Sequence, residues 1–188
     1  MRKLIIPSLL VFSLACQDTT PLGPPMGDVD SPEVIAAFDE SGVVSSAAGS
    51  GHFAVFTDAV NSFMFNAKEK ADGTVNGKAT MHIRLFGTFW KVDIDCLAVN
   101  GNVAVVSGVV STSNTPYIGT GGWFAMEDNG EGGKAEPDRI TGFYGTPPPY
   151  SPVPDYCHEV AQDIDAYLAP YQVKWNEVIR GNLQVRGG

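Results

Sequence analysis

The sequence predicts an all-β protein: one antiparallel β-barrel or sandwich of about seven or eight strands with a single helix in its C-terminal region. Three observations lead to this prediction. From Gly51 onward, apolar residues recur mostly at every second position, which is the period of a strand. Turn signals such as Asp72-Gly73 and Asn100-Gly101 separate these stretches. The chain has 21 glycines and only 18% charged residues, a composition typical of a turn-rich globular domain.

The N-terminal residues read as a secretion signal. Arg2 and Lys3 form a basic start, and an almost unbroken apolar run covers residues 4–14. This run of eleven residues is too short to cross a bilayer, so it indicates an export signal over residues 1–15 rather than a membrane span.

The end of this signal, Ser13-Leu14-Ala15-Cys16, resembles the lipobox of bacterial lipoproteins, with Ser13 where that family usually has Leu. The resemblance implies that Cys16 becomes the new N-terminus and carries the lipid, a diacylglycerol with a palmitate-type acyl chain. The protein would then be exported and anchored to the cell envelope. Gln17 implies sorting to the outer membrane if the host has one. An ordinary secretory signal with an incidental cysteine is the alternative.

Residues 16–48 are expected to form a lipidated N-terminus and a flexible tether, and residues 49–188 the β domain. Four prolines and two glycines within residues 17–32, with almost no apolar periodicity, are typical of a solvated linker. The mature chain would carry ten basic and twenty-one acidic residues, a formal charge of −11. So acidic a chain repels nucleic acid and anionic lipid headgroups, so we expect no nucleic-acid partner.

Within the domain, the clearest strand is residues 74–85, where apolar and polar side chains alternate over twelve positions. A two-residue turn at Phe86-Gly87 would pair it with residues 88–99. Further strands are expected at residues 52–56, 62–67, 102–112, 121–128, 139–144 and 183–186. The pairs predicted for the first hairpin are Ile83 with Trp90, Met81 with Val92, Ala79 with Ile94, Gly77 with Cys96, His82 with Lys91, Thr80 with Asp93, and Lys78 with Asp95.

Asn100-Gly101 joins the next hairpin, because a type I′ turn needs positive φ at both central positions. Continuing the register predicts Cys96 opposite Val105, Ile94 opposite Ser107, and Val92 opposite Val109. The other face of residues 102–112 is also apolar, so a helix, a second sheet layer or a ligand must cover it. A helix over residues 156–168, capped by Asp155 and ended by Pro170, is one such cover.

Assigning Cys16 to lipid leaves Cys96 and Cys157, and an even remainder in an exported protein predicts a disulfide between them. Two separate buried thiols are the alternative. The three histidines, His52, His82 and His158, lack the spacing of a zinc motif, so we expect no metal and no cofactor.

Three further features carry possible chemistry. The loop from Asp128 to Asp138, rich in Asp, Asn, Glu and Gly, is either a calcium loop or an acidic surface loop, although it fails the EF-hand template. The patch of His82, Asp93 and Asp95 suits acid–base chemistry or is a solvated sheet face. Four aromatic residues either line a ligand cavity or pack the core: Trp90, Trp123, Phe124 and Trp175.

The run from Val92 to Ala104, together with Asp128-Asn129-Gly130-Glu131 and Pro137-Asp138-Arg139-Ile140, resembles a group of uncharacterised exported bacterial β-domains. This resemblance spans residues 51–144 and implies a β fold without implying an activity.

Our leading functional hypothesis is a non-enzymatic, lipid-anchored extracytoplasmic protein that binds a small ligand or an envelope protein, or has a structural role. A hydrolase built on His82, Asp93 and Asp95 or on the Asp128–Asp138 loop is the first alternative. An inhibitor that presents the loops 113–121 and 129–138 is the second. Fold class alone decides among none of these.

Overall fold

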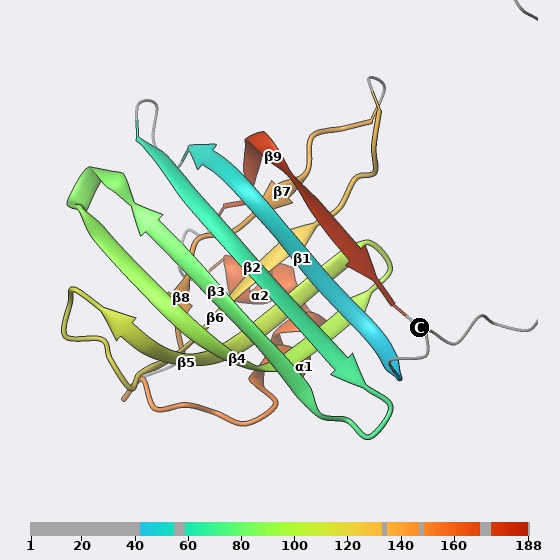
Figure 1. Ribbon diagram of the computed structural model, residues 1–188, viewed down its shortest axis with the longest axis horizontal. Helices are drawn as coiled ribbons and strands as arrows, with labels where there is room; N and C mark the ends of the chain where they lie inside the picture. Colours follow the sequence, from blue (N-terminus) through green and yellow to red (C-terminus); the bar gives the residue numbers. More distant parts are fainter. Residues whose placement is uncertain (1–41, 55–58, 133–134, 147–148, 170–173, 188) are drawn as a thin grey trace, which may run out of the picture. The chain divides into compact units, whose positions relative to one another are not determined.

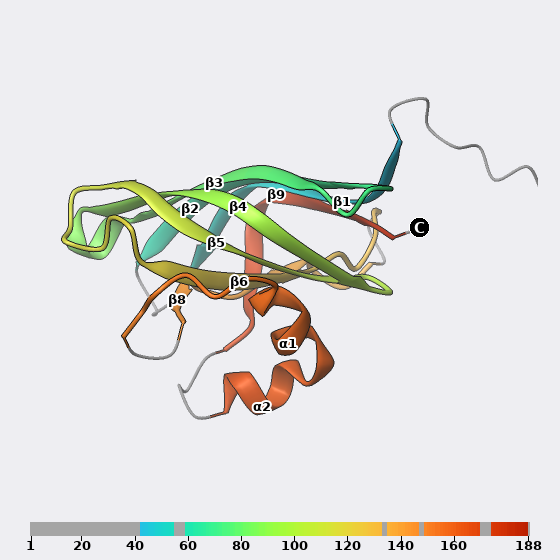
Figure 2. The ribbon, with the colours of Figure 1, turned by 90° about the horizontal axis from the view of Figure 1, so that it is seen from below.

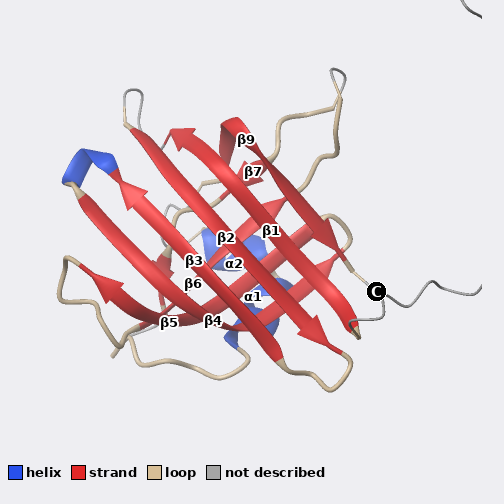
Figure 3. Cartoon of the chain, in the orientation of Figure 1, coloured by secondary structure: helices blue, strands red, loops and turns tan. Residues whose placement is uncertain are grey.

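A computed structural model describes residues 42–54, 59–132, 135–146, 149–169 and 174–187. Cys16, the predicted signal and most of the predicted tether lie outside these residues. Strands make up most of the described chain (Figure 3). The elements are β1 (Val43–Ala54), β2 (Val60–Lys70), β3 (Val75–Ile83), η1 (Arg84–Phe86), β4 (Thr88–Asn100), β5 (Val103–Ser113), β6 (Gly121–Glu127), β7 (Arg139–Ile140), β8 (Tyr144–Gly145), α1 (Tyr156–Gln162), α2 (Ile164–Leu168) and β9 (Asn176–Arg186).

The strands form one antiparallel sheet that closes on itself (Figure 1). Each strand from β1 to β6 pairs with the next, β7 joins β6 to β9, and β9 pairs with β1. The short β8 pairs with β6 beyond β7, along the same edge. The ring of ladders makes the fold a barrel, the first of the two predicted all-β architectures, and closure leaves few exposed strand edges.

The barrel interior is filled with apolar side chains. Phe53, Phe63, Phe65 and Phe124 form a continuous series of ring contacts with centroids 5.4–6.1 Å apart. Buried side chains from seven strands and β7 complete this core, namely Ala47, Ala67, Ala79, Met81, Val92, Ile94, Leu97, Ala104, Val106, Val110, Met126, Ile140 and Leu183. Because these side chains occupy the interior, the barrel is a packed core rather than a ligand container.

A second apolar cluster lies outside the barrel, where α1 and α2 cover β4, β5 and β6 (Figure 2). It contains Trp123, Ala125, Val105, Tyr156, Val160 and Leu168. A helix was predicted to cover this second apolar face, and helical segments do cover it. The helix is broken, however, at Asp163, whose side chain accepts a hydrogen bond from the Ala166 N–H and caps α2. No helix in the described part of the chain is long and apolar enough to cross a membrane.

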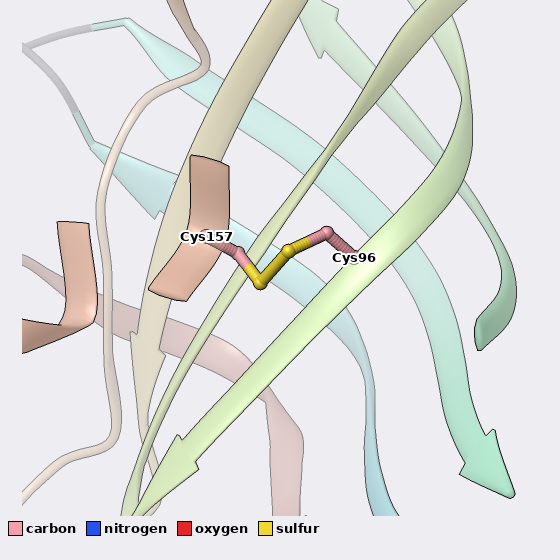
Figure 4. The surroundings of a disulfide bond; sticks show 2 residues. All are labelled: Cys96 and Cys157. Atoms are coloured by element: carbon pink, nitrogen blue, oxygen red, sulfur yellow. A yellow bond between two sulfur atoms is a disulfide. The ribbon is translucent and has the colours of Figure 1, made fainter. Parts of the chain in front are cut away.

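A disulfide joins Cys96 of β4 to Cys157 of α1, as predicted (Figure 4). Its Cα atoms lie 5.8 Å apart, and both side chains are buried between the helix and the sheet. It therefore links the helical layer covalently to the barrel wall.

The register predicted for the β3–β4 hairpin is wrong by two residues. Ala79 pairs with Val92, and Lys78 pairs with Asp93 rather than Asp95. The connection is longer than the assumed two-residue turn, because η1 occupies residues 84–86 and Gly87 follows with a left-handed φ of 59°. Glycine adopts this conformation without a Cβ penalty.

The register predicted for the β4–β5 hairpin is also wrong. Cys96 pairs with Ser107 rather than Val105, because the turn lies at Gly101-Asn102 and Asn100, predicted as a turn residue, ends β4 and pairs with Val103. Beyond Cys96 the register shifts again, since Asp95 forms a bulge and Ile94 pairs with Gly108. A bulge adds one residue to one strand, so the side chains beyond it change faces. Ile94 consequently points into the barrel, while Cys96 points outward to the helix.

Three predicted boundaries differ from the structure. The domain start expected at Gly49 falls inside β1, because small residues (Ser, Ala, Gly) form its first half and mimic a linker in composition. The strand expected at residues 139–144 is interrupted, because the Thr141 hydroxyl accepts the Ala125 N–H in place of a strand carbonyl. The last strand begins at Asn176 rather than at residue 183.

Candidate functional site

The two ends of the barrel differ in chemistry. The end with η1 and the β5–β6 loop, at the left of Figure 1, is called here the aromatic end. Nine large apolar residues are exposed in the described chain, and five belong to loops at this end. An apolar patch of this kind is typical of a binding surface. The five are Leu85, Phe86, Tyr117, Ile118 and Tyr150.

Two adjoining cavities open among these loops, with volumes of about 200 and 310 Å³. Both are lined by Trp90, Phe143 and Tyr144, so they adjoin, and we call the two together the aromatic groove. None of the lining residues in the described part of the chain is acidic or basic. The remaining lining residues are Ala59, Asn61, Ile83, Leu85, Phe86, Tyr117, Thr120, Gly142, Gly145 and Tyr150.

Contacts with neighbouring side chains hold the aromatic rings of the groove in place. The Trp90 ring lies 5.8 Å from the Phe143 ring, and the Trp90 Nε1–H donates to Thr115 Oγ1 at 3.4 Å. Phe143 occupies space that only glycine leaves free, because a Cβ on Gly122 would lie 2.2 Å from its ring. Tyr144 packs on the buried Trp123 at 5.5 Å, and this burial raises the pKa of the Tyr144 hydroxyl, which stays neutral.

Tyr150 lies at the groove edge in a strained conformation. Its φ of 64° is left-handed, which is uncommon for a bulky residue. The conformation is held because the Gly121 N–H donates to the Tyr150 carbonyl at 2.8 Å. The Tyr150 ring also packs against Gly145, where a Cβ would lie 2.8 Å from it. Strain that the surroundings maintain in this way is frequent at functional sites.

The proposed acid–base patch is not assembled. His82 pairs with Phe89 and stacks on its ring at 5.7 Å. Asp93 lies four residues further along β4, about 13 Å away at strand spacing. It pairs instead with Lys78 Nζ at 2.8 Å, and the Lys78 hydrogen bond lowers the pKa of Asp93. Asp95 lies on the bulge, where partial burial and the nearby Asp155 raise its pKa. These three groups have separate surroundings and form no common site.

The acidic loop has a structural role. The Leu183 N–H donates to Asp138 Oδ2 at 2.9 Å, and the Val185 N–H donates to Asp128 Oδ2 at 3.0 Å. The remaining carboxylate oxygens accept the N–H groups of Asn129 and Gly130 within the loop, both at 2.9 Å. These carboxylates thus take the place of a neighbouring strand along the edge of β9 beyond β7. With their oxygens engaged by backbone donors, the geometry favours the alternative of an acidic structural loop over a calcium loop.

One cluster of potential metal ligands lies elsewhere. Atoms of Cys96, Cys157 and His158 all lie within 4.8 Å of one another. The two sulfurs are bonded to each other, so they are not thiolate ligands in this structure.

The four aromatic residues considered from the sequence have different roles. Trp90 lines the groove, whereas Trp123 is buried under the helices and Phe124 lies inside the barrel. The Trp175 ring lies 5.3 Å from the Arg139 guanidinium. Sequence reasoning missed Tyr117, Phe143, Tyr144 and Tyr150. The available signal was that residues 114–122 and 141–154 contain Tyr, Phe, Pro, Gly and Thr but no charged residue.

The two loops considered for an inhibitor lie at opposite ends of the barrel. Residues 113–121 contribute Tyr117 and Thr120 to the aromatic groove, while residues 129–138 follow the other end of β6. They therefore cannot form a single inhibitory surface. Comparison with known proteins gives no further guide, since no protein family, no curated protein and no solved structure matches this chain.

Proposed function

We propose that this chain is a lipid-anchored cell-envelope protein that binds a small neutral ligand in the aromatic groove. The observation that carries the proposal is the groove itself: aromatic side chains held by packing, with no ionised side chain among the lining residues that the structure describes. Binding sites for small molecules are typically concave, aromatic and furnished with a few polar groups. In the described lining, the hydroxyl groups are those of Thr120 and the tyrosines, and no acidic, basic or histidine side chain accompanies them.

The anchoring part of the proposal rests on the sequence. The basic start, the apolar run and Cys16 follow the order of a lipoprotein signal. The chain enters the barrel at Val43, where β1 begins at the end opposite the aromatic groove. Such an arrangement leaves the groove free when the N-terminus is attached to a membrane.

Two measurements test this proposal. Growth of the host with an alkyne fatty acid should label the full chain but not a Cys16→Ser variant, while Cys96→Ser should still be labelled. Absence of label on the wild type would refute the anchor. Native mass spectrometry of the full mature chain, purified without denaturant, should detect a bound small molecule. Its loss in Trp90→Ala and its retention in Met64→Ala, a change at an exposed position of β2, would assign it to the groove.

A further inference from the structure

We infer that the ligand of the aromatic groove is a neutral saccharide whose ring faces stack on Trp90, Tyr117 and Tyr150. This inference rests on the proposed function, because it names the class of ligand for that same site. Three properties of the groove lead to it, namely its charge, its pattern of polar edges and its extent.

Charge excludes most ionised ligands. The chain has 12 basic and 21 acidic residues, yet among the residues that the structure describes no charged side chain lines the groove. Arg84 of η1 lies at this end, and it is not among the lining residues. An ionised ligand would lose hydration without gaining a counter-charge, which is strongly unfavourable. Uronic acids, nucleotides and phospholipid headgroups therefore fit poorly.

The side chains present apolar faces with polar edges. Tyr117 and Tyr150 are about half exposed and line the groove, so part of each side chain is accessible to a ligand. A pyranose ring has the matching arrangement, with C–H groups on its faces and hydroxyl groups around its edge. Tyrosine and tryptophan suit such ligands because each combines an apolar body with one polar group. A wholly apolar ligand would instead leave the tyrosine hydroxyls desolvated and without partners.

The groove is longer than one cavity. Trp90, Phe143 and Tyr144 form the floor shared by its two parts, and Tyr117 and Tyr150 lie on one side of this floor. The larger part, about 310 Å³, is at the lower limit of the ~300–1,000 Å³ usual for small-molecule sites. A ligand that continues into the second part would make more contact than a single sugar unit, which indicates an oligosaccharide. The maintained strain at Tyr150 further suggests that the position of its ring matters.

The test measures binding of defined glycans to the full chain by isothermal calorimetry and by tryptophan fluorescence. The neutral panel consists of hexasaccharides of glucose, of mannose and of N-acetylglucosamine. The acidic panel consists of a polygalacturonate and a sulfated glycan. We expect binding to at least one neutral hexasaccharide, tighter than to its monosaccharide. Trp90→Ala and Tyr150→Ala should each weaken it by roughly tenfold, as expected for loss of one stacked ring. Met64→Ala should bind like the wild type.

Other outcomes separate this inference from the proposed function. Failure of the whole neutral panel overturns the saccharide assignment, as does preference for the acidic panel. If a proline-rich peptide or phosphatidylcholine vesicles bind instead, and Trp90→Ala abolishes that binding, the groove remains a binding site for a different partner. If native mass spectrometry also finds no bound molecule and no probe binds, the proposed function fails too. Circular dichroism of both alanine variants verifies that loss of binding is not loss of folding.

Discussion

The replacement Asp138→Asn tests whether carboxylates substitute for a strand along β9. Asp138 accepts the Leu183 N–H and the Asn129 N–H, both at 2.9 Å, with one oxygen each. Asparagine keeps nearly the same shape but has a single acceptor oxygen. Its amide N–H₂ group would face one of the two backbone donors, which would lose its partner.

The expected cost follows from these two bonds. A hydrogen bond to a charged group contributes about 1.5–3 kcal/mol, and a buried donor without a partner costs about 1–3 kcal/mol. Because Asp138 is half-buried, we expect Asp138→Asn to lower the free energy of unfolding by about 2–4 kcal/mol. At roughly 2–4 °C per kcal/mol for a domain of this size, the Tm should fall by about 10 °C.

Urea and thermal unfolding followed by circular dichroism measure this loss, with Glu136→Gln as the matched control. Glu136 lies in the same loop but is exposed, so its change should alter stability by less than about 0.5 kcal/mol. Hydrogen exchange provides a local readout, because the Leu183 amide should lose protection in Asp138→Asn. Equal stability of the two variants, with the Leu183 amide still protected, would refute the role assigned to the carboxylate.

Three further predictions concern stability. Dithiothreitol should lower the free energy of unfolding by up to about 4 kcal/mol, the chain-entropy value for a loop of 61 residues. It should have no effect on a Cys96→Ser/Cys157→Ser variant. Equal urea midpoints of the wild type with and without reductant would contradict this prediction. The hydrogen bond from Arg139 lowers the pKa of Glu127 below its usual 4.5, so ionised Glu127 stabilises the fold above that pH and this stabilisation is lost as the pH falls. The urea midpoint of Glu127→Gln should therefore depend less on pH in the acid range than that of the wild type. Partial burial and the nearby Asp155 raise the pKa of Asp95 above its usual 3.8, so the ionised side chain destabilises the fold at pH 7. Asp95→Asn should therefore raise the Tm at pH 7. If the Tm difference between this variant and the wild type does not shrink toward acid pH, the raised pKa is not its cause.

The sequence predicted which residues face the core better than it predicted their partners. Along β3, alternation correctly assigns Ala79 and Met81 to the interior and Lys78 to solvent. A shift of two residues preserves both faces, so the hydrophobic pattern cannot distinguish it from the true register. The turn decides between them, and its 3₁₀ conformation at residues 84–86 left no clear signal in the sequence.

The bulge at Asp95 was equally hidden, and it has the largest structural consequence. Strict alternation places Ile94 and Cys96 on one face, where a disulfide to an outer helix would be impossible. The extra residue turns Cys96 outward, so it meets Cys157 while Ile94 stays in the core. The cysteine count predicted the bond, but the alternation pattern alone contradicted it.

The candidate site was the least predictable part. Its rings come from η1, β4, the β5–β6 loop, the segment between β7 and β8, β8 itself and the loop after β8, so only the fold brings them together. The acidic loop shows the same limit, because Asp128 and Asp138 meet partners 57 and 45 residues further along the chain. Neither relation has a local spacing that a motif search can detect.

The order of the strands also has a consequence for orientation. In an up-and-down barrel, alternate connections lie at alternate ends, and here the acidic ones share the end where β1 begins. Asp72, Asp128, Glu131 and Asp138 lie in these connections, while Lys68, Lys70 and Arg186 lie at the adjoining strand ends, so this end carries charges of both signs. If Cys16 carries the lipid, the linker predicted over residues 17–41 would span about 28 Å, enough to hold the barrel away from the membrane surface. To bring the groove onto its own membrane, the barrel would have to invert on this linker. The proposed anchor therefore favours a ligand located beyond the membrane surface, such as an envelope glycan, over the lipid bilayer itself.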